Sequence, residues 1–222
     1  HQQMMESIHL ALDAVEALGY VDPERVGLHG HSYSGQGSAY IATRSDRFAA
    51  ITAGAAATNL VSDFNQLWKS AGTNQHGYDT YGQGRFATNP YDDFELFVDQ
   101  SAAQNAHRVS TPLLLLHGTE DGSVEWLQAV EFYNGLRWNG KAVILLSYPG
   151  AGHGLRDYED QKDFQIRMRQ FFDFHLRDVP APKWMEAGRS FLQKRRDIEM
   201  MERGGNGRSS GRGGGPGGGG SS

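Results

Sequence analysis

Three residues whose types suit nucleophilic catalysis stand in glycine-rich segments of the sequence. Ser32 lies in the run GHSYSG, Asp121 in EDG and His153 in GAGHG. A serine hydroxyl is a weak nucleophile and needs a base within hydrogen-bonding distance. A histidine can supply that base, and a carboxylate can hold the histidine in the required tautomer. The three residues therefore predict a site in which Ser32 attacks, His153 carries the proton and Asp121 orients His153.

Each of the three residues follows a short apolar run typical of a buried strand. These runs are RVGLHG before Ser32, TPLLLLHG before Asp121 and KAVILLSY before His153, and FAAITAGAA adds a fourth. Helical patterns at 4–18, 35–44, 123–136 and 157–176 alternate with them. Alternating strands and helices predict an α/β protein with a parallel sheet, whose strands end at a common edge. Serine, aspartate and histidine follow one another in the order used by α/β-hydrolases, so we expect that fold.

The turn around Ser32 also predicts how a developing oxyanion is stabilised. A sharp strand-to-helix turn would lift the Ser32 side chain clear of the sheet, and flanking glycines would allow close packing there. The backbone N–H of Tyr33, at the start of the following helix, would donate to the oxyanion.

A metal-dependent hydrolase is an alternative for the same strand ends. His29 and His31 form an H-x-H pair, and His117, Asp121 and His153 would be further ligands. A metal site does not require glycines around Ser32, so we favour the serine mechanism and expect neither a metal nor another cofactor. His29 and His117 then become hydrogen-bonded structural groups.

A substrate pocket is expected in residues 58–108, which are rich in aromatic and polar types but weakly periodic. Trp68, Tyr78, Tyr81 and Phe86 could line an acyl pocket for an apolar side chain. The same aromatic rings could equally pack this segment onto the sheet.

The composition limits the classes of protein to which this chain can belong. The 222 residues carry a formal net charge of −5 and no cysteine, which excludes disulfides and gives no sign of a nucleic-acid partner. No apolar run reaches the roughly 20 residues of a membrane-spanning helix. The region 204–222 is almost wholly Gly, Ser and Arg and is expected to be a disordered tail, after an extension at 188–203.

Three longer segments resemble the catalytic domain of the prolyl oligopeptidase family of serine peptidases. They are YVDPERVGLHGHSYSG, TPLLLLHGTEDGSV and SYPGAGHGLRDYEDQKDF. The likeness is strongest to dipeptidyl-peptidase-like and acylaminoacyl-peptidase-like members. It implies an α/β-hydrolase catalytic domain over 1–187, with Ser32 as nucleophile, Asp121 as orienting residue and His153 as base. In this fold the sheet is mostly parallel and flanked by helices, and this chain would form its C-terminal part.

The resemblance further implies that this chain is the C-terminal part of a longer protein. An N-terminal β-propeller and the first strands of the sheet would precede it, so localisation stays open between periplasmic or secreted and cytoplasmic. Two positions depart from the family pattern: Ser34 replaces a usual glycine, and Ala151 replaces a frequent glutamate.

The functional expectation is a serine peptidase that hydrolyses bonds of short peptides through an acyl-enzyme. A carboxylesterase acting on small or carbohydrate esters would use the same triad, and a non-catalytic fragment or binding module is the third alternative.

Overall fold

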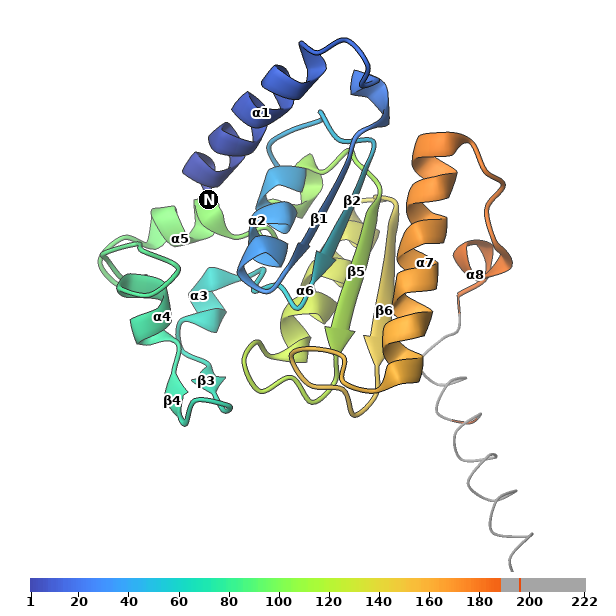
Figure 1. Cartoon of the computed structure of the whole chain (residues 1–222). Helices are drawn as coiled ribbons and strands as arrows, with labels where there is room; N and C mark the ends of the chain where they lie inside the picture. Colours follow the sequence, from blue (N-terminus) through green and yellow to red (C-terminus); the bar gives the residue numbers. More distant parts are fainter. Residues whose placement is uncertain (189–195, 197–222) are drawn as a thin grey trace, which may run out of the picture. The chain divides into compact units, whose positions relative to one another are not determined.

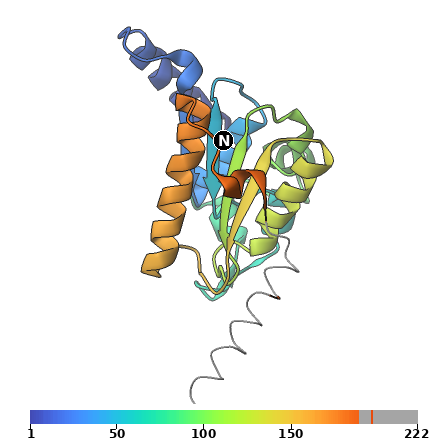
Figure 2. The same cartoon turned by 90° about the vertical axis from the view of Figure 1, so that its right-hand side faces the viewer.

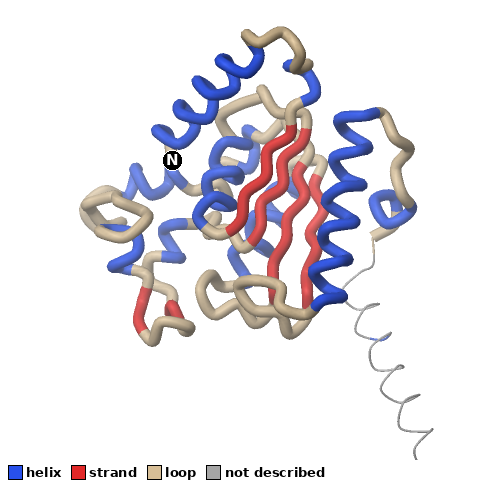
Figure 3. The backbone as a smooth tube through the Cα atoms, viewed as in Figure 1, coloured by secondary structure: helices blue, strands red, loops and turns tan. Residues whose placement is uncertain are grey.

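A four-stranded parallel sheet forms the centre of the protein (Figures 1 and 3). The computed structural model describes residues 1–188 and residue 196. The strands are β1 (Gly27–His31), β2 (Ala50–Gly54), β5 (Leu113–Gly118) and β6 (Val143–Tyr148), and they lie side by side in that order. The expected parallel sheet and all four expected strands are confirmed.

The strand register aligns apolar side chains across the sheet. Leu28 pairs with Ile51, Ile51 with Leu113, and Leu113 with Val143. Successive residues of a strand point to opposite faces. Accordingly Leu113 packs into the main core cluster, whereas Leu116 joins a second cluster on the other face. Both faces of the sheet are buried, which is why its strands read as continuous apolar runs.

Helices cover both faces, as Figure 2 shows edge-on. α2 (Tyr33–Ala42) and α6 (Trp126–Trp138) contribute Ile41 and Phe132 to the main cluster. α1 (Gln2–Glu16) packs onto this layer through side chains that include Ile8. α7 (Tyr158–Arg177) lies on the opposite face, where Phe164 contacts the second cluster.

The long segment between β2 and β5 folds into short elements. They are α3 (Leu60–Asp63), a small hairpin of β3 (Leu67–Trp68) and β4 (Thr73–Asn74), α4 (His76–Thr80) and α5 (Phe94–Gln100). Leu60, Phe64 and Phe97 form a small core of their own. Single 3₁₀ turns lie at Pro23–Arg25 and Ala106–Arg108. This compact segment stands beside the sheet and supplies walls of the site described below (Figure 1).

The compact unit that holds the sheet spans His1–Ala181. A second unit begins at Pro182 and contains α8 (Lys183–Glu186). The expected tail at 204–222, and all of the expected extension at 188–203 except residues 188 and 196, lie outside the described residues. Within the described part of the chain, no helix is both long enough and apolar enough to cross a membrane.

Candidate active site

Ser32 occupies a strained turn between β1 and α2. Its φ is 59° and its ψ is −125°, a conformation that L-residues rarely adopt. Its N–H donates to the Gly54 carbonyl oxygen at 2.8 Å. A Cβ at Gly30 would lie 2.1 Å from the Ser34 carbonyl oxygen, and one at Gly35 would lie 2.3 Å from the Gly54 oxygen. The flanking glycines are therefore required because backbone passes too close for any side chain.

Ser34 replaces the usual glycine without opening the turn. Its hydroxyl donates to the His31 carbonyl oxygen at 2.8 Å and accepts the His31 N–H at 3.0 Å. This small side chain thus ties the two sides of the turn together.

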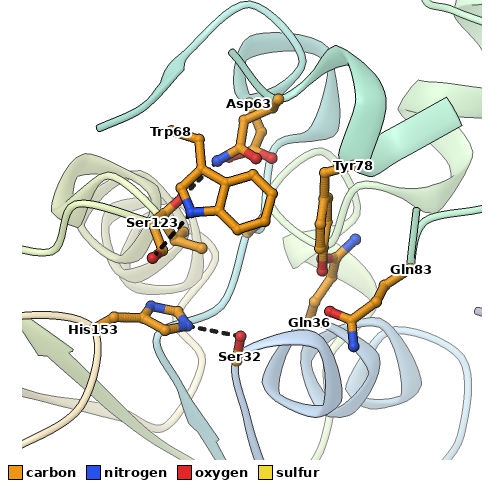
Figure 4. Close-up of a pocket in the computed structure, with 11 residues that line it drawn as sticks. Ser32, Gln36, Asp63, Trp68, Tyr78, Gln83, Ser123 and His153 are labelled. Atoms are coloured by element: carbon orange, nitrogen blue, oxygen red, sulfur yellow. Dashed lines mark hydrogen bonds between the residues drawn. The ribbon is translucent and has the colours of Figure 1, made fainter. Parts of the chain in front are cut away.

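The structure brings Ser32, His153 and Asp121 together in one chain of hydrogen bonds. His153 Nε2 lies 2.7 Å from Ser32 Oγ, and His153 Nδ1 lies 2.8 Å from Asp121 Oδ2. Figure 4 shows the bond between His153 and Ser32 at the floor of a cavity. The Asp121 side chain is fully buried, whereas that of His153 is 30% exposed. The histidine can therefore meet a substrate while the carboxylate cannot.

Close packing at the strand ends sets the position of His153. β5 and β6 end beside each other, where Gly118 pairs with Tyr148. A Cβ at Gly118 would lie 2.2 Å from the Ala151 carbonyl oxygen. The Glu120 N–H also donates to that oxygen at 2.9 Å. The loop carrying His153 is therefore anchored to the loop carrying Asp121.

Asp121 is ionised despite its burial. Burial alone would raise its pKa, but hydrogen bonds from His117, His153 and the N–H groups of Val124 and Ser123 outweigh that effect. Together they hold the pKa of Asp121 well below its usual range. A negative charge is thus fixed beside His153 Nδ1.

His31 contacts the histidine loop, a role that the sequence did not reveal. Its Nε2 lies 2.8 Å from the His153 carbonyl oxygen. Burial is the main cause that lowers the pKa of His31, which favours the neutral ring. A neutral ring with its proton on Nε2 donates to that oxygen. The only sequence signal was its position beside Ser32, because the contact joins residues 122 apart in the chain.

The other two strand-end histidines also make hydrogen bonds, and His117 shares the Asp121 carboxylate with His153. His117 is fully buried, with Nε2 3.2 Å from Asp121 Oδ2 and 3.0 Å from the Val124 carbonyl oxygen. His29 Nδ1 hydrogen-bonds Thr52 Oγ1 beneath α7. Among the residues that the structure describes, no group of three His, Cys, Asp or Glu side chains could hold a metal ion.

A cavity of about 480 Å³, counting its open mouth, lies over Ser32 and His153. Trp68 and Tyr78 line it, and their rings meet edge to face at 5.7 Å. Tyr81 does not line it: this residue directly follows α4 and is 88% exposed. Its predicted contact with substrate therefore stays a prediction that this cavity does not support. Phe86 packs instead with Phe97 in the small core.

Tyr33 is the first residue of α2. The N–H groups of a helix's first turn have no partner within the helix. The N–H of Tyr33 is therefore free of intrahelical bonding directly after Ser32.

The sequence is similar to that of known peptidases. Residues 1–179 match the family model described as "Prolyl oligopeptidase family". The uncharacterized peptidase YuxL of Bacillus subtilis is 30% identical over 74% of this chain and 24% of its own length. Human dipeptidyl peptidase 8 is likewise 30% identical, over 74% of this chain and 18% of its own. The chain thus spans about a quarter or less of these relatives.

Solved structures agree on the fold. A puromycin-hydrolyzing peptidase of Mycobacterium tuberculosis superposes with a TM-score of 0.66 at 25% identity, covering 78% of this chain and 25% of that one. The acylaminoacyl peptidase of Pyrococcus horikoshii gives 0.65 at 25% identity, covering 78% and 28%. This chain has the fold of the α/β-hydrolase peptidases. The family model covers nearly all of its described residues. The chain belongs to the prolyl oligopeptidase family.

Proposed function

We propose that the full-length protein is a serine peptidase that hydrolyses bonds of short peptides through an acyl-enzyme. The observation that carries the proposal is the continuous hydrogen-bonded chain from Ser32 Oγ through His153 to Asp121. In this reaction Ser32 is the nucleophile, His153 the base and Asp121 the residue that orients the base.

Acylation proceeds in two proton transfers. Ser32 Oγ attacks the carbonyl carbon of the scissile bond while His153 Nε2 takes the hydroxyl proton. The Tyr33 N–H donates to the resulting oxyanion. His153 then protonates the leaving amine as the C–N bond breaks, which leaves an ester on Ser32 and the free amine product.

Deacylation repeats the sequence with water. His153 removes a proton from a water molecule as it attacks the ester, and then returns that proton to Ser32 Oγ. The acid product leaves and the enzyme is restored. In both halves the ionised Asp121 stabilises the positively charged His153, and its low pKa keeps it from taking the proton itself.

The names of the relatives support a peptide substrate. YuxL is described as a peptidase, and acylamino-acid-releasing enzyme of rat is 32% identical over 37% of this chain. Because such relatives are several times longer, the proposal includes an N-terminal β-propeller in the full-length protein. A propeller would restrict substrates to short peptides by limiting access to Ser32.

Substitution of the nucleophile tests the proposal. Ser32→Ala should remove hydrolysis of aminoacyl nitroanilides by the full-length protein, whereas Ser7→Ala, an exposed serine on α1, should retain it. Nitrophenyl esters should be assayed in parallel. Turnover of esters without any turnover of nitroanilides would favour the esterase alternative, and undiminished nitroanilide hydrolysis by Ser32→Ala would refute the proposed mechanism.

A further inference from the structure

The cavity over Ser32 contains a carboxyl group that the proposed chemistry does not use. Asp63, the last residue of α3, lines this cavity and is only 1% exposed. Among the described residues, none hydrogen-bonds its Oδ1 atom. Burying a polar group without a partner destabilises the folded state, and burying an unpaired charge does so more strongly. A group left in this state is one for which a ligand can supply the missing partner.

A rigid segment holds Asp63 in place. Asn59 caps α3 by accepting the Ser62 N–H, and Leu60 is fully buried in the small core with Phe97. α3 therefore cannot turn Asp63 to solvent without breaking that core.

The neighbourhood of Asp63 is acidic. Asp79 on α4 is fully buried, and neither of its carboxyl oxygens has a partner among the described residues. Burial, followed by the charges of Asp79, Asp121 and Glu125, raises the pKa of Asp63 well above its usual range. No ion pair of the described chain involves Asp63 or Asp79. These surroundings favour a proton on Asp63, and a cation bound beside the carboxyl group would favour loss of that proton.

The remaining walls suit a long side chain with a charged end. Trp68, Tyr78 and Val124 offer aromatic and aliphatic surface along the cavity. Such surface packs against the methylene stem of a lysine or arginine, and aromatic rings attract the cation. Gln36, 3% exposed on the same cavity, also has an Nε2 atom without a partner. Because that atom is a hydrogen-bond donor, it suits an acceptor atom of the substrate, whereas the carboxyl group of Asp63 is the one that pairs with a cation.

We propose that this cavity is the acyl pocket and that Asp63 selects substrates whose residue N-terminal to the scissile bond is lysine or arginine. The proposal rests on the serine peptidase function proposed above. Figure 4 shows Ser32 and His153 on one side of the cavity and Asp63 on the other, with Trp68 and Tyr78 between them. A side-chain cation reaches across this space, whereas an α-ammonium group stays close to the scissile carbonyl and to Ser32.

Three nitroanilide substrates distinguish recognition of a side-chain cation from recognition of an α-ammonium group in the full-length protein. N-acetyl-lysine carries a side-chain cation, N-acetyl-norleucine has the same carbon chain without charge, and norleucine with a free amine carries only an α-ammonium group. Hydrogen bonds to charged groups contribute about 1.5–3 kcal/mol, so kcat/KM for N-acetyl-lysine should exceed that for N-acetyl-norleucine by about tenfold or more. A ratio of one or less overturns the proposal without any variant.

Asp63→Asn keeps the shape and removes the charge. It should lower the lysine-to-norleucine ratio by about tenfold or more, while Asp46→Asn, on an exposed aspartate, should keep the wild-type ratio. Circular dichroism checks that each variant is folded. An unchanged ratio in folded Asp63→Asn overturns the proposal, as does a loss confined to the substrate with a free amine.

Labelling by a fluorophosphonate separates failure of this inference from failure of the proposed function. If the wild-type protein reacts and hydrolyses N-acetyl-norleucine nitroanilide but shows no preference for lysine, only the role of Asp63 is wrong. If it neither reacts nor hydrolyses any of the three substrates, the serine peptidase function is wrong as well.

Discussion

At the scale of single residues, the proposed mechanism depends on the charge that Asp121 holds beside His153. Four hydrogen-bond donors keep its pKa well below the usual range against the opposing effect of burial. Asn at this position keeps the shape but presents an amide, and loss of the correct tautomer costs about 10⁴ in kcat in such triads. Asp121→Asn should therefore lower kcat by roughly that factor, measured with a nitroanilide and with melting temperature as the check on folding. A fall smaller than about tenfold would remove Asp121 from the mechanism.

His31 is a positioning residue, because it acts through the backbone of His153. His31→Phe keeps a ring but removes the donor, so kcat should fall by up to about tenfold, which corresponds to one neutral hydrogen bond. His31→Gln retains a donor and should recover part of the loss, with KM changing less than kcat in both variants. Steady-state kinetics measure the effect. Equal kcat in the two variants would show that the hydrogen bond does not matter.

Some residues of the site could be predicted from the sequence and others could not. Ser32, Asp121 and His153 were predicted because each follows an apolar strand in a glycine-rich run, and the strands of a parallel sheet end together. The hydrogen bond of His31 to the His153 loop and the place of Asp63 in the cavity were not predicted, because both depend on segments far apart in the chain. Tyr81 was assigned to the pocket on aromatic type alone, but it follows α4 and is exposed.

At the scale of elements, the turn between β1 and α2 depends on close backbone approach. Gly35→Ala would push a Cβ against the Gly54 carbonyl oxygen, which belongs to the neighbouring strand β2. Overpacking of this kind costs about 1–3 kcal/mol, so the melting temperature should fall by several degrees. Activity should fall with it, because the turn carries Ser32.

Gly77→Ala is the matched control for that substitution. No atom lies within 4 Å of a Cβ at Gly77, and its φ is not positive. Differential scanning calorimetry should give a melting temperature close to that of the wild type. An equal shift in both variants would mean that the contact with Gly54 does not constrain the turn.

The strands themselves were predictable from sequence, but their order was not. Runs such as LLLL at 113–116 indicate a strand buried on both faces. The choice of partner, with β2 between β1 and β5, is a tertiary outcome of how the helices cross over. The short elements between β2 and β5 had only weak periodicity in the sequence, which did not reveal their own small core of Leu60, Phe64 and Phe97.

At the scale of the whole molecule, buried acids near the cavity should make stability depend on pH. Burial raises the pKa of Asp79 to about 7, from an ordinary value near 4. Between these values the folded state binds more protons than the unfolded state, so stability falls as pH rises through that window. Asp79→Asn removes this penalty. Its melting temperature relative to the wild type should therefore be higher at pH 8 than at pH 5.

That measurement reports on Asp79 together with its effect on Asp63. The charge of Asp79 is one cause of the raised pKa of Asp63, so Asp79→Asn also weakens the pH dependence that comes from Asp63, and both effects have the same sign. Asp46→Asn, on an exposed carboxyl group, should follow the wild type at both pH values. A relative melting temperature of Asp79→Asn that stays constant, or falls, between pH 5 and pH 8 would contradict a raised pKa for Asp79.

The site at which a covalent inhibitor attaches shows whether Ser32 is the nucleophile. The full-length protein is treated with a fluorophosphonate, digested with trypsin and mapped by tandem mass spectrometry. Cleavage after Arg25 and Arg44 releases one peptide, residues 26–44, which contains the serines 32, 34 and 38. Fragment ions should place the phosphonate on Ser32, because only that hydroxyl lies 2.7 Å from His153 Nε2 in the described structure. A label on Ser34, on Ser38 or outside this peptide would contradict the account.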